Sequence, residues 1–462
     1  MTTARIIAAE VLRRSRDREG FVADILDRLA GPLSPQDRRL AVQLVNGVVR
    51  RRGTLDCLFA AFMTRPLRET HPDTLDLLRL GTFQIALLTH VPKHAAVHET
   101  VEIAPPVVKK FVNAILRKVA DAVTDEFTDE MGPKAIPFGA SRVGDDAGEP
   151  GTRPFTGSAR QYRKLTLPLL PDPAADFAEY LSAAHSWPRW LARRWLERFG
   201  PDECVRLGFW FNAPPPLWLR IDPAKVSRDD YLILLAAQNI DGVAGDHPQS
   251  VKLLDGVSVR DLPGYATGEF AVQDHSSMLV ASALDPQPGW RVLDLCAAPG
   301  GKTTHLAELM RNRGKIVACD IAPERLDTVT TLCQRMGVTI VEPYLITAEC
   351  PAPDGPFDAA LVDVPCSNTG VLGRRPEVRW RIQPEEFEHL IRLQTRLLFD
   401  AAERVKPGGV IVYSTCSIEH DECGGVVRAA LRGMRDLKLE AEAMAIPGEP
   451  SDGGYWARLR KA

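Results

Sequence analysis

The sequence predicts a multidomain protein with an all-helical N-terminal domain, an α+β middle region and an α/β C-terminal domain. Its 462 residues are too many for one compact unit and suggest roughly three domains of about 150 residues each. Apolar residues recur at helical spacing over residues 1–125, whereas short apolar runs alternate with helical stretches after residue 281. This change of period separates a helical domain from one that contains a sheet.

Residues 1–125 are expected to form the helical domain. Ile6, Ile7, Val11 and Leu12 show the spacing of one helix face, and the same spacing continues along the segment. The segment holds 19 Lys and Arg against 14 Asp and Glu, a charge of +5; because the whole chain carries −3, the remainder carries −8. A basic excess on helices is commonly just a solvated face, but it also suits a nucleic-acid partner.

Residues 126–164 are expected to be a flexible linker or surface insertion. Within them, positions 132–157 hold six Gly and four Pro, a level typical of low-complexity sequence. The pattern over 165–280 is mixed: the aromatic-rich helical stretch HSWPRWLARRWLERFG ends at Gly200, and three prolines at 214–216 lead into the alternating strand LWLRID. We therefore expect an α+β middle region over residues 165–280.

Five short apolar runs in residues 281–462 are expected to be buried strands of a parallel sheet. Helical stretches separate them, which is the pattern of a sheet with helices on both faces. The runs cover residues 291–295, 315–320, 338–341, 357–363 and 409–414. In such sheets ligands bind beyond the carboxyl ends of the strands, so the residues that follow each run are the candidates for function.

The first run continues into a turn of small residues, Asp294-Leu-Cys-Ala-Ala-Pro-Gly-Gly-Lys-Thr303, and then into a helix. Paired glycines let the backbone approach a ligand, and the helix N-terminus offers unpaired N–H groups. Two phosphate motifs do not fit: a P-loop needs Gly five residues before Gly301, where Cys296 stands, and GxGxxG is absent. The turn therefore favours a different nucleoside cofactor.

The second run ends in Asp320, seventeen residues after Thr303. A carboxylate at this place can accept hydrogen bonds from two ribose hydroxyls. Taken alone, an Asp at the end of a strand is more often a helix N-cap. Its spacing from the glycine turn favours the ribose contact.

Nine cysteines stand at wide spacings with no CxxC pair, which argues against a disulfide framework and against a metal site. Reduced thiols in a cytoplasmic protein are expected. Cys366 and Cys416 differ from the others because each follows the carboxyl end of a predicted strand. A lone cysteine is usually a small buried hydrophobe, but a loop thiol beside cationic groups can become a reactive thiolate. The candidate cationic neighbours are Lys302, Arg374, Arg375 and Arg379.

Three motifs in order, DLCAAPGGKT, DVPCSNTGVLGRRPEVRW and YSTCS, together resemble the RNA 5-methylcytosine methyltransferases of the Sun/nucleolar-protein family. VQDHSSMLVASALDPQPGWRVLD looks like that family's lead-in to its cofactor domain, and PPPLWLRID like its RNA-contacting region. Segments 40–52, 78–84 and 111–117 resemble the NusB-like helical domain that marks the bacterial small-subunit ribosomal RNA methyltransferase B type. The resemblance covers nearly all of the chain except about 126–165.

The resemblance implies an all-α NusB-like RNA-binding domain over residues 1–125, an RNA-contacting α+β domain over 165–280, and an α/β Rossmann-like class I methyltransferase domain over 281–462. It implies S-adenosylmethionine as the methyl donor and ribosomal RNA as the substrate. The cofactor contacts that it implies are Cys296, Ala297, Ala298, Pro299, Gly300, Gly301, Lys302, Asp320, Arg325, Thr347 and Asp363.

The chemistry of this family explains why it needs thiols. C5 of cytosine is a poor nucleophile, and addition of a thiolate at C6 makes C5 able to attack a methyl group. By resemblance the nucleophile is the Cys of the Thr-Cys-Ser motif, here Cys416, and Cys366 of the Pro-Cys motif helps to release the product. Asp363 would contact the base and transfer a proton.

Three positions depart from the family pattern. Asn368 stands where Gly is usual, and Glu422-Cys423-Gly424 replaces Glu-Asn-Glu after Cys416. Thr347 occupies the approximate place of a third-strand Asp that normally approaches the adenine.

The expected function is transfer of a methyl group to C5 of a specific cytidine in 16S ribosomal RNA through a covalent cysteine–C6 adduct. The same reaction on transfer RNA is an alternative that the NusB-like domain disfavours. A non-catalytic RNA-binding or ribosome-assembly factor is a second alternative, which the presence of both cysteines, Lys302 and Asp363 disfavours. No apolar run approaches the length of a membrane span, and we expect a monomer.

Overall fold

The computed structural model describes residues 3–17, 20–139, 160–254 and 256–462. The chain folds into two compact units, an N-terminal unit of Met1–Pro215 with Leu372–Arg381 and a C-terminal unit of Pro216–Val371 with Ile382–Ala462. The region 165–280, expected to be one domain, is therefore divided after Pro215. Its helical first part packs with the N-terminal helices, whereas its strands belong to the other unit.

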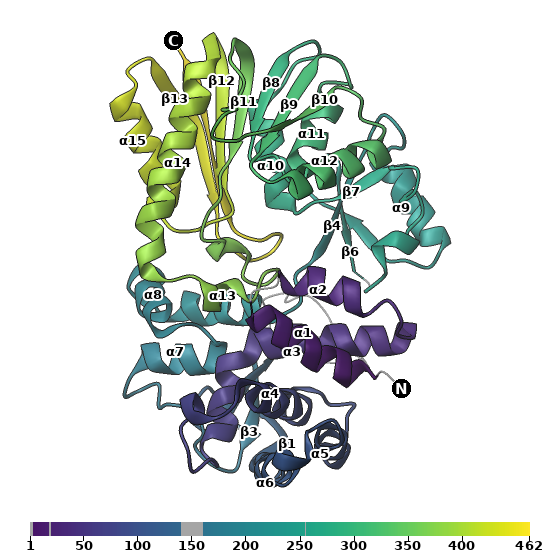
Figure 1. Cartoon of the computed structure of the whole chain (residues 1–462), viewed down its shortest axis with the longest axis vertical. Helices are drawn as coiled ribbons and strands as arrows, with labels where there is room; N and C mark the ends of the chain where they lie inside the picture. The colour runs from purple at the N-terminus through teal and green to yellow at the C-terminus, as the bar shows by residue number, and fades with distance from the viewer. Residues whose placement is uncertain (1–2, 18–19, 140–159, 255) are drawn as a thin grey trace. The chain divides into compact units, whose positions relative to one another are not determined.

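The N-terminal unit is mainly helical, as the spacing of its apolar residues predicts. Its longer helices are α1 (Ala4–Arg16), α2 (Val22–Leu29), α3 (Pro35–Ala60), α4 (Pro72–Leu87), α5 (Lys93–Glu102), α6 (Pro106–Ala122), α7 (Phe177–His185) and α8 (Arg189–Asn212) (Figure 1). The Ser34 hydroxyl caps α3 by accepting a hydrogen bond from the Asp37 N–H at 3.1 Å. Because α1, α3, α5 and α6 pack around α4, that helix is buried along nearly its whole length. Gly200, at φ +78°, breaks α8 where the sequence predicts a helix end.

The prediction of a linker over residues 126–164 is wrong for the part that the structure describes. β1 (Val123–Thr128), β2 (Ala135–Gly139) and β3 (Gln161–Leu165) form an antiparallel sheet in the order β1-β3-β2. Ile136 and Phe138 are buried in the same core as the helices. The surrounding Gly and Pro thus concealed a short apolar strand, and residues 140–159 lie outside the described part of the chain.

One segment packs in the N-terminal unit although it comes late in the sequence. Residues 372–381 include the short helix α13 (Val378–Arg381). Trp380 donates a hydrogen bond from Nε1 to the Val49 carbonyl at 3.4 Å, and Arg381 donates from Nη2 to the Gly20 carbonyl at 2.8 Å. The chain therefore passes between the two units three times, after residues 215, 371 and 381.

The C-terminal unit begins with a small antiparallel sheet in the order β5-β6-β4-β7. The prolines at 214–216 lead into β4, as the sequence predicts. Apolar residues of the sheet and of the neighbouring helix form a core of their own. The elements are β4 (Leu217–Ile221), α9 (Arg228–Ala237), β5 (Gly242–Ala244), β6 (Ser250–Leu253) and β7 (Phe270–Val272).

The rest of the unit is built on a mixed seven-stranded sheet in the order β10-β9-β8-β11-β12-β14-β13. β8 to β12 are parallel, and β14 and β13 are added antiparallel at one edge. The strands are β8 (Arg291–Leu295), β9 (Lys315–Asp320), β10 (Val341–Leu345), β11 (Phe357–Asp363), β12 (Val405–Thr415), β13 (Leu437–Ala445) and β14 (Gly454–Lys461).

Four of the five predicted strands lie where the apolar runs stand, and the third is displaced. β10 covers Val341–Leu345 instead of 338–341, because an edge strand tolerates Pro343 and exposed polar residues. The sequence also missed β13 and β14. Their exposed positions carry charged residues such as Glu440 and Arg460, so neither strand is a continuous apolar run.

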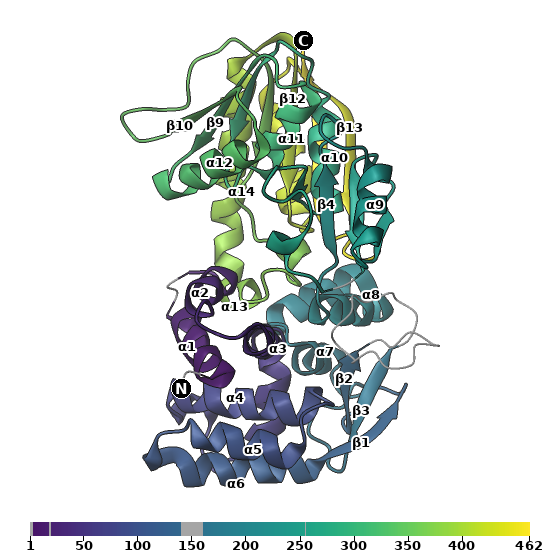
Figure 2. The ribbon, with the colours of Figure 1, turned by 90° about the vertical axis from the view of Figure 1, so that its right-hand side faces the viewer.

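Helices cover both faces of the large sheet. α10 (His275–Leu284), α11 (Gly301–Leu309) and α12 (Pro323–Met336) lie on one face, and α14 (Pro384–Arg404) and α15 (Val426–Gly433) lie on the other (Figure 1). Figure 2 turns the α10–α12 face towards the viewer. Successive residues of a strand pack on opposite faces of the sheet. In β8, Val292 lies in the same hydrophobic core as Leu306 of α11, whereas Leu293 lies in the core that contains Leu398 of α14. The residues after β8, β9, β11 and β12 consequently meet at one edge of the sheet.

Candidate active site

Residues 296–301 form a tight turn between β8 and α11. Cys296, at φ +63°, and Gly300, at φ +99°, both have left-handed backbone conformations. A Cβ at Gly300 would lie 3.1 Å from Val329 Cα of α12, so the position requires glycine. A Cβ at Gly301 would meet no described atom within 4 Å. The first turn of α11, whose N–H groups lack helical partners, therefore opens onto free space.

Asp320 lies beside this turn. Its Oδ1 accepts a hydrogen bond from the Ile321 N–H at 2.8 Å, and its Oδ2 accepts one from the Ala298 N–H at 3.4 Å. Arg325 lies 3.5 Å from Asp320 Oδ2 and donates to the Ala298 carbonyl at 3.1 Å. Because α12 begins at Pro323 with Ala322 as its N-cap residue, Asp320 is not the N-cap of that helix.

Asp294, which has no role in the sequence prediction, lies fully buried below the turn. Burial raises its pKa to about 7, although the hydrogen bond from Thr303 Oγ1, at 2.7 Å, acts against the shift. Its Oδ1 has no hydrogen-bond partner among the described residues. A buried acceptor without a donor calls for an explanation, and a donor on a bound ligand is one. The signal in the sequence was an acidic residue inside an otherwise apolar strand.

Lys302 and Asp363 connect α11 to the end of β11. Lys302 Nζ lies 2.7 Å from Asp363 Oδ2, and Ser414 donates its hydroxyl to Asp363 Oδ1 at 2.7 Å. Burial lowers the pKa of Lys302, but the interaction with the Asp363 carboxylate more than offsets it, and the pKa is raised. Lys302 is thus a cation paired with the carboxylate of Asp363, and its predicted place beside a thiol stays a prediction.

The two predicted thiols face each other. Cys366 Sγ and Cys416 Sγ lie 3.3 Å apart, and no disulfide joins any of the nine cysteines, all of which lie in the described part of the chain. The hydrogen bond with Cys416, together with burial, raises the pKa of Cys366 well above its usual value. Cys366 is therefore protonated at neutral pH. Burial also raises the pKa of the Cys296 thiol, to about 12, so that thiol is protonated as well.

For two of the three arginines predicted to neighbour the thiols, the structure gives partners within the N-terminal unit. Arg379 is fully buried in the N-terminal unit, where its guanidinium donates to the carbonyls of Arg50 and Phe211 at 3.1 and 3.2 Å. Arg375 lies over the ring of Phe21, with its Cζ atom 4.8 Å from the centroid. Both arginines belong to residues 372–381, which pack in the N-terminal unit.

Glu422 holds the two cysteine loops, a role that the sequence did not reveal. Its fully buried carboxylate accepts hydrogen bonds from the backbone N–H and the hydroxyl of Ser367, which follows Cys366. It also accepts one from Ser417 Oγ at 2.6 Å and one from Gln394 Nε2 at 2.8 Å. The sequence had marked Glu422 only as the start of an unusual segment.

Asn368, which stands where the family usually has Gly, has the left-handed conformation that Gly adopts easily, at φ +57°. Asn is among the few other residues that tolerate it. Its Nδ2 donates to the Cys366 carbonyl at 2.8 Å, and its Oδ1 accepts a hydrogen bond from the Cys416 thiol at 3.3 Å. The substitution therefore keeps the loop shape and adds a link between the two cysteine loops.

Thr347 follows β10 in an exposed turn. Its hydroxyl accepts a hydrogen bond from the Cys350 N–H at 3.0 Å, and its backbone N–H donates to the Cys350 carbonyl at 2.9 Å. The residue before it, Ile346, donates its N–H to the Asp320 carbonyl at 2.9 Å. Thr347 thus lies at the sheet edge next to Asp320, and its contact with an adenine stays a prediction.

A mixed seven-stranded sheet with a glycine turn after β8 and an acidic residue at the end of β9 defines a Rossmann-like methyltransferase. A probable ribosomal RNA small subunit methyltransferase B from Synechocystis sp. is 34% identical over 451 residues, which cover 95% of this chain and 91% of that protein. The ribosomal RNA small subunit methyltransferase B of Klebsiella pneumoniae is 31% identical over 99% of this chain and 98% of its own. The chain belongs to the ribosomal RNA small subunit methyltransferase B family.

Profiles of known families match three parts of the chain. The 16S rRNA methyltransferase RsmB/F family matches residues 281–450, the NusB family residues 2–121, and the ferredoxin-like domain of RsmF/B-like methyltransferases residues 187–260. The crystal structure of PH0851 has the same fold, with a TM-score of 0.76, 23% sequence identity and coverage of 100% of this chain and 99% of that one. The predicted fold classes of all three parts are thereby confirmed. None of the described helices combines the length and apolarity needed to cross a bilayer.

Proposed function

We propose that the protein transfers a methyl group from S-adenosylmethionine to C5 of a cytidine in small-subunit ribosomal RNA, through a covalent bond between Cys416 and C6. The observation that carries the proposal is the pair of facing thiols, with sulfur atoms 3.3 Å apart, at the sheet edge that also bears the Lys302–Asp363 pair. A purely structural protein has no need of two partly buried thiols and a charged pair in one place.

The residues around the glycine turn fit the proposed methyl donor. The open space at Gly301 and the unpartnered Oδ1 of Asp294 suit a ligand that carries hydrogen-bond donors. Asp320 would accept the ribose hydroxyls, and Arg325 would lie near the adenosine. The cofactor would supply an activated methyl group. Residues Cys296 to Lys302 would supply the backbone that surrounds it.

The two thiols have different roles in the proposed reaction on the cytosine base. Cys416 adds to C6, which turns C5 into a nucleophile, and C5 then accepts the methyl group. A water molecule then takes the C5 proton, the electrons of that C–H bond re-form the C5–C6 double bond, and the Cys416 sulfur leaves C6 with the electron pair of the broken C–S bond. Cys366, whose raised pKa keeps it protonated, would assist this release. Asp363 would contact the base, held in place by Lys302 and Ser414.

The RNA substrate is supported by the N-terminal part of the chain. Residues 1–125 carry a net charge of +5 and match the NusB family over 2–121. A basic helical domain suits a phosphate backbone. Both relatives described above are named ribosomal RNA small subunit methyltransferase B, so ribosomal RNA is a better substrate candidate than transfer RNA. The base must leave its stack to reach the thiols, at a cost of a few kcal/mol.

The decisive experiment incubates the full chain with methyl-tritiated S-adenosylmethionine and, separately, protein-free 16S ribosomal RNA, small ribosomal subunits and total transfer RNA. Digestion to nucleosides and chromatography then identifies the labelled product. We expect label in 5-methylcytidine from ribosomal RNA. RNA that carries tritium at cytosine C5 provides a second readout, because methylation must release that tritium to water.

Each substrate tests a separate part of the proposal. Label only in transfer RNA would overturn the ribosomal substrate while leaving the reaction standing. Label in a base other than cytosine would overturn the chemistry assigned to Cys416. Cofactor binding without transfer to any of the three substrates would support the non-catalytic alternative.

A further inference from the structure

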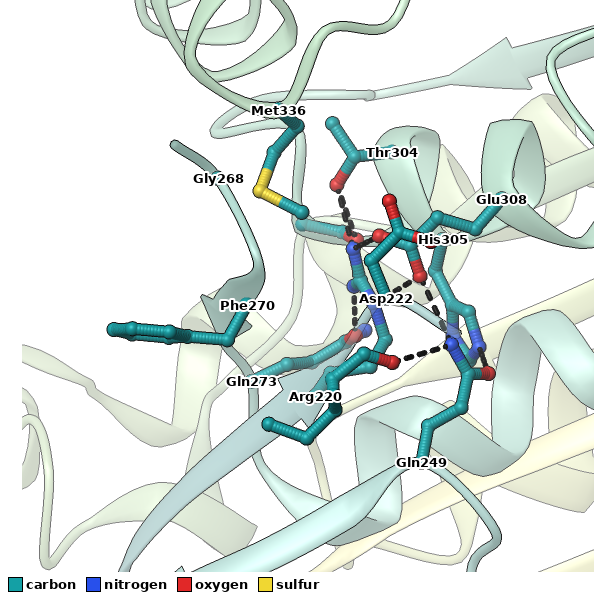
Figure 3. Close-up of polar contacts among 12 residues, drawn as sticks. Arg220, Asp222, Gln249, Gly268, Phe270, Gln273, Thr304, His305, Glu308 and Met336 are labelled. Carbon is teal, nitrogen blue, oxygen red and sulfur yellow. Dashed lines mark hydrogen bonds and ion pairs between the residues drawn. The ribbon is translucent and has the colours of Figure 1, made fainter. Parts of the chain in front are cut away.

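Arg220 of β4 is the centre of a buried polar cluster that joins the small sheet to α11 (Figure 3). Its side chain is fully buried, and all five of its N–H groups donate hydrogen bonds. Nε and Nη2 form a two-point pair with Glu308 at 2.9 and 2.7 Å. Nη1 donates to Gln273 and to the Gly301 carbonyl, the latter at 2.7 Å, and Nη2 also donates to Thr304 Oγ1 at 3.0 Å.

A neutral amide, that of Gln249, also contacts Glu308, and the nearby carboxylate of Asp222 acts to raise the pKa of Glu308. Gln249 donates from Nε2 to Glu308 Oε2 and to the Ile221 carbonyl, each at 3.0 Å. The Gln249 oxygen is therefore the acceptor for His305, so that His305 carries its proton on Nε2, at 3.0 Å. Burial lowers the pKa of His305 well below its usual value, so the imidazole is neutral. The cluster thus holds a fixed arrangement of donors and acceptors around one ion pair.

Two of the residues of α11 that Arg220 contacts, Gly301 and Thr304, lie on the first turn of that helix, next to the glycine turn, whereas Glu308 lies one turn further along. Thr304, which accepts from Arg220, itself donates to the Gly300 carbonyl at 3.0 Å. The two residues between Gly301 and Thr304 point to the active site: Lys302 pairs with Asp363, and Thr303 donates to Asp294. One buried side chain from a different sheet therefore fixes the turn that presents Lys302.

Burying the Arg220–Glu308 ion pair costs free energy, so holding the small sheet against α11 does not by itself account for it. Two ions lose their hydration on burial, and well-packed apolar residues of similar volume commonly hold two layers together at least as well. What apolar residues cannot do is fix the position of a carbonyl and a hydroxyl. Arg220 does both, at Gly301 and Thr304.

We propose that Arg220 is a positioning residue: it fixes the start of α11, and with it the cofactor loop 296–302, relative to the small sheet. The inference rests on the proposed function insofar as that loop binds S-adenosylmethionine. It makes cofactor affinity depend on a side chain that does not belong to the cofactor site. A movement of the small sheet would then shift the glycine turn, because Arg220 connects the two.

The chain provides a matched control. Arg335 of α12 also joins the helical layer to the small-sheet region, donating from Nη1 to the Tyr265 and Phe270 carbonyls, both at 3.0 Å. It does not contact α11 in any of these bonds. Arg220→Met and Arg335→Met each remove one guanidinium between the same two layers. Only Arg220→Met releases the first turn of α11.

The test measures the dissociation constant of S-adenosylmethionine by calorimetry and the amide hydrogen exchange of residues 296–304, for the full chain and the two variants. We expect Arg220→Met to weaken binding about tenfold, a size usual for coupling through a packed network, and to speed exchange in that segment. Arg335→Met should leave both near wild type. Arg220→Lys, which keeps the charge but not the two-point geometry, should fall between and replaces Arg220→Met if that variant does not fold.

Equal affinities and equal exchange in the Arg220 and Arg335 variants would overturn the inference. If the wild-type protein binds the cofactor but methylates no RNA, the proposed function is wrong. The cofactor affinities of the Arg220 and Arg335 variants would still decide this inference. Wild-type protein that does not bind the cofactor would leave hydrogen exchange of residues 296–304 to decide it alone.

Discussion

The sulfur atoms of Cys366 and Cys416 lie 3.3 Å apart, although the two residues follow different strands, β11 and β12. These strands are neighbours in the parallel sheet, with Asp363 paired in register with Ser414. The sheet register therefore determines that the two loops, fifty residues apart in sequence, share one site. A pair of thiols this close can act on the same atom of a substrate, which makes their separate roles testable.

Replacement of Cys416 by alanine should abolish methyl transfer and leave cofactor binding intact, because the glycine turn does not depend on that sulfur. Activity is measured by transfer of tritium to RNA, and binding by calorimetry. Cys350→Ala is the matched control, since it removes an exposed thiol at the end of another strand. Turnover of Cys416→Ala above a thousandth of wild type would rule out its role as nucleophile.

Replacement of Cys366 by alanine should allow the bond between Cys416 and C6 to form but slow its release. We expect a covalent complex of protein and radiolabelled RNA, seen as a retarded band on a denaturing gel. The double variant Cys366→Ala/Cys416→Ala should give no such band. If the band persists in the double variant, another residue forms the bond.

Replacement of Glu422 by alanine should destabilise the C-terminal unit by roughly 3 kcal/mol, because buried donors of Ser367, Ser417 and Gln394 lose their acceptor. The denaturant midpoint of that unit measures the effect. Asp421→Ala is the control, since the neighbouring Asp421 side chain is exposed. A loss below about 1 kcal/mol, a value typical of exposed groups, would mean that the cysteine loops do not depend on Glu422.

Two replacements of Asn368 should separate backbone strain from its side-chain contacts. Asn368→Gly and Asn368→Ala both lose the bonds to Cys366 and Cys416, but only alanine is strained at φ +57°. We expect the alanine variant to be the less stable of the two by about 1 kcal/mol, as measured by urea unfolding. Both should lower the methylation rate by a similar factor. Equal stability would show that the loop adopts another conformation once the side chain is removed.

Protonation of His247 should make the C-terminal unit lose stability, relative to the His247→Asn variant, as the solution is acidified from about pH 6.5 towards pH 4. His247 accepts a hydrogen bond on Nδ1 from the Gln249 N–H at 3.2 Å, and burial, followed by the charges of His275 and Arg220, lowers its pKa to about 4. The unfolded chain binds the proton more readily than the folded one in this window, so protonation favours unfolding. Urea midpoints at pH 7 and pH 5 measure the loss. His247→Asn, which can still accept from that N–H, should lose less stability over the same interval.

The sequence predicts the strands well where apolar residues form an uninterrupted run. β8, β9 and β11 begin and end where those runs do, because each is buried on both faces. The sequence predicts strands poorly where a strand is not buried on both faces. β10 is an edge strand, β13 is largely exposed, and β2 is a short apolar stretch surrounded by Gly and Pro. These elements owe their stability to partners distant in sequence, which no local pattern reveals.

The candidate site shows the same division. Motif positions locate Cys366, Cys416, Lys302 and Asp363 in one place, because each follows a strand or the glycine turn. The residues that hold them, Glu422 and Arg220, carry no local signal: Glu422 joins Ser367, 55 positions away, and Arg220 joins Gly301, 81 positions away. Arg379 shows the reverse error, since it lies close to Cys366 in sequence but packs among carbonyls of the N-terminal unit.

The assignment of residues 372–381 to the N-terminal unit has a consequence for biosynthesis. Chains emerge from the ribosome from the N-terminus, and a domain normally folds once its own residues are out. Here residues 216–371, that is 156 residues, must be made before the last part of the N-terminal unit exists. In the complete protein the Arg379 guanidinium donates hydrogen bonds to the carbonyls of Arg50, His185 and Phe211. Before Arg379 has been synthesised, these carbonyls lack that donor. A nascent chain stopped before residue 372 carries all of the N-terminal helices up to α8 and cannot complete their packing, so the two units must mature together.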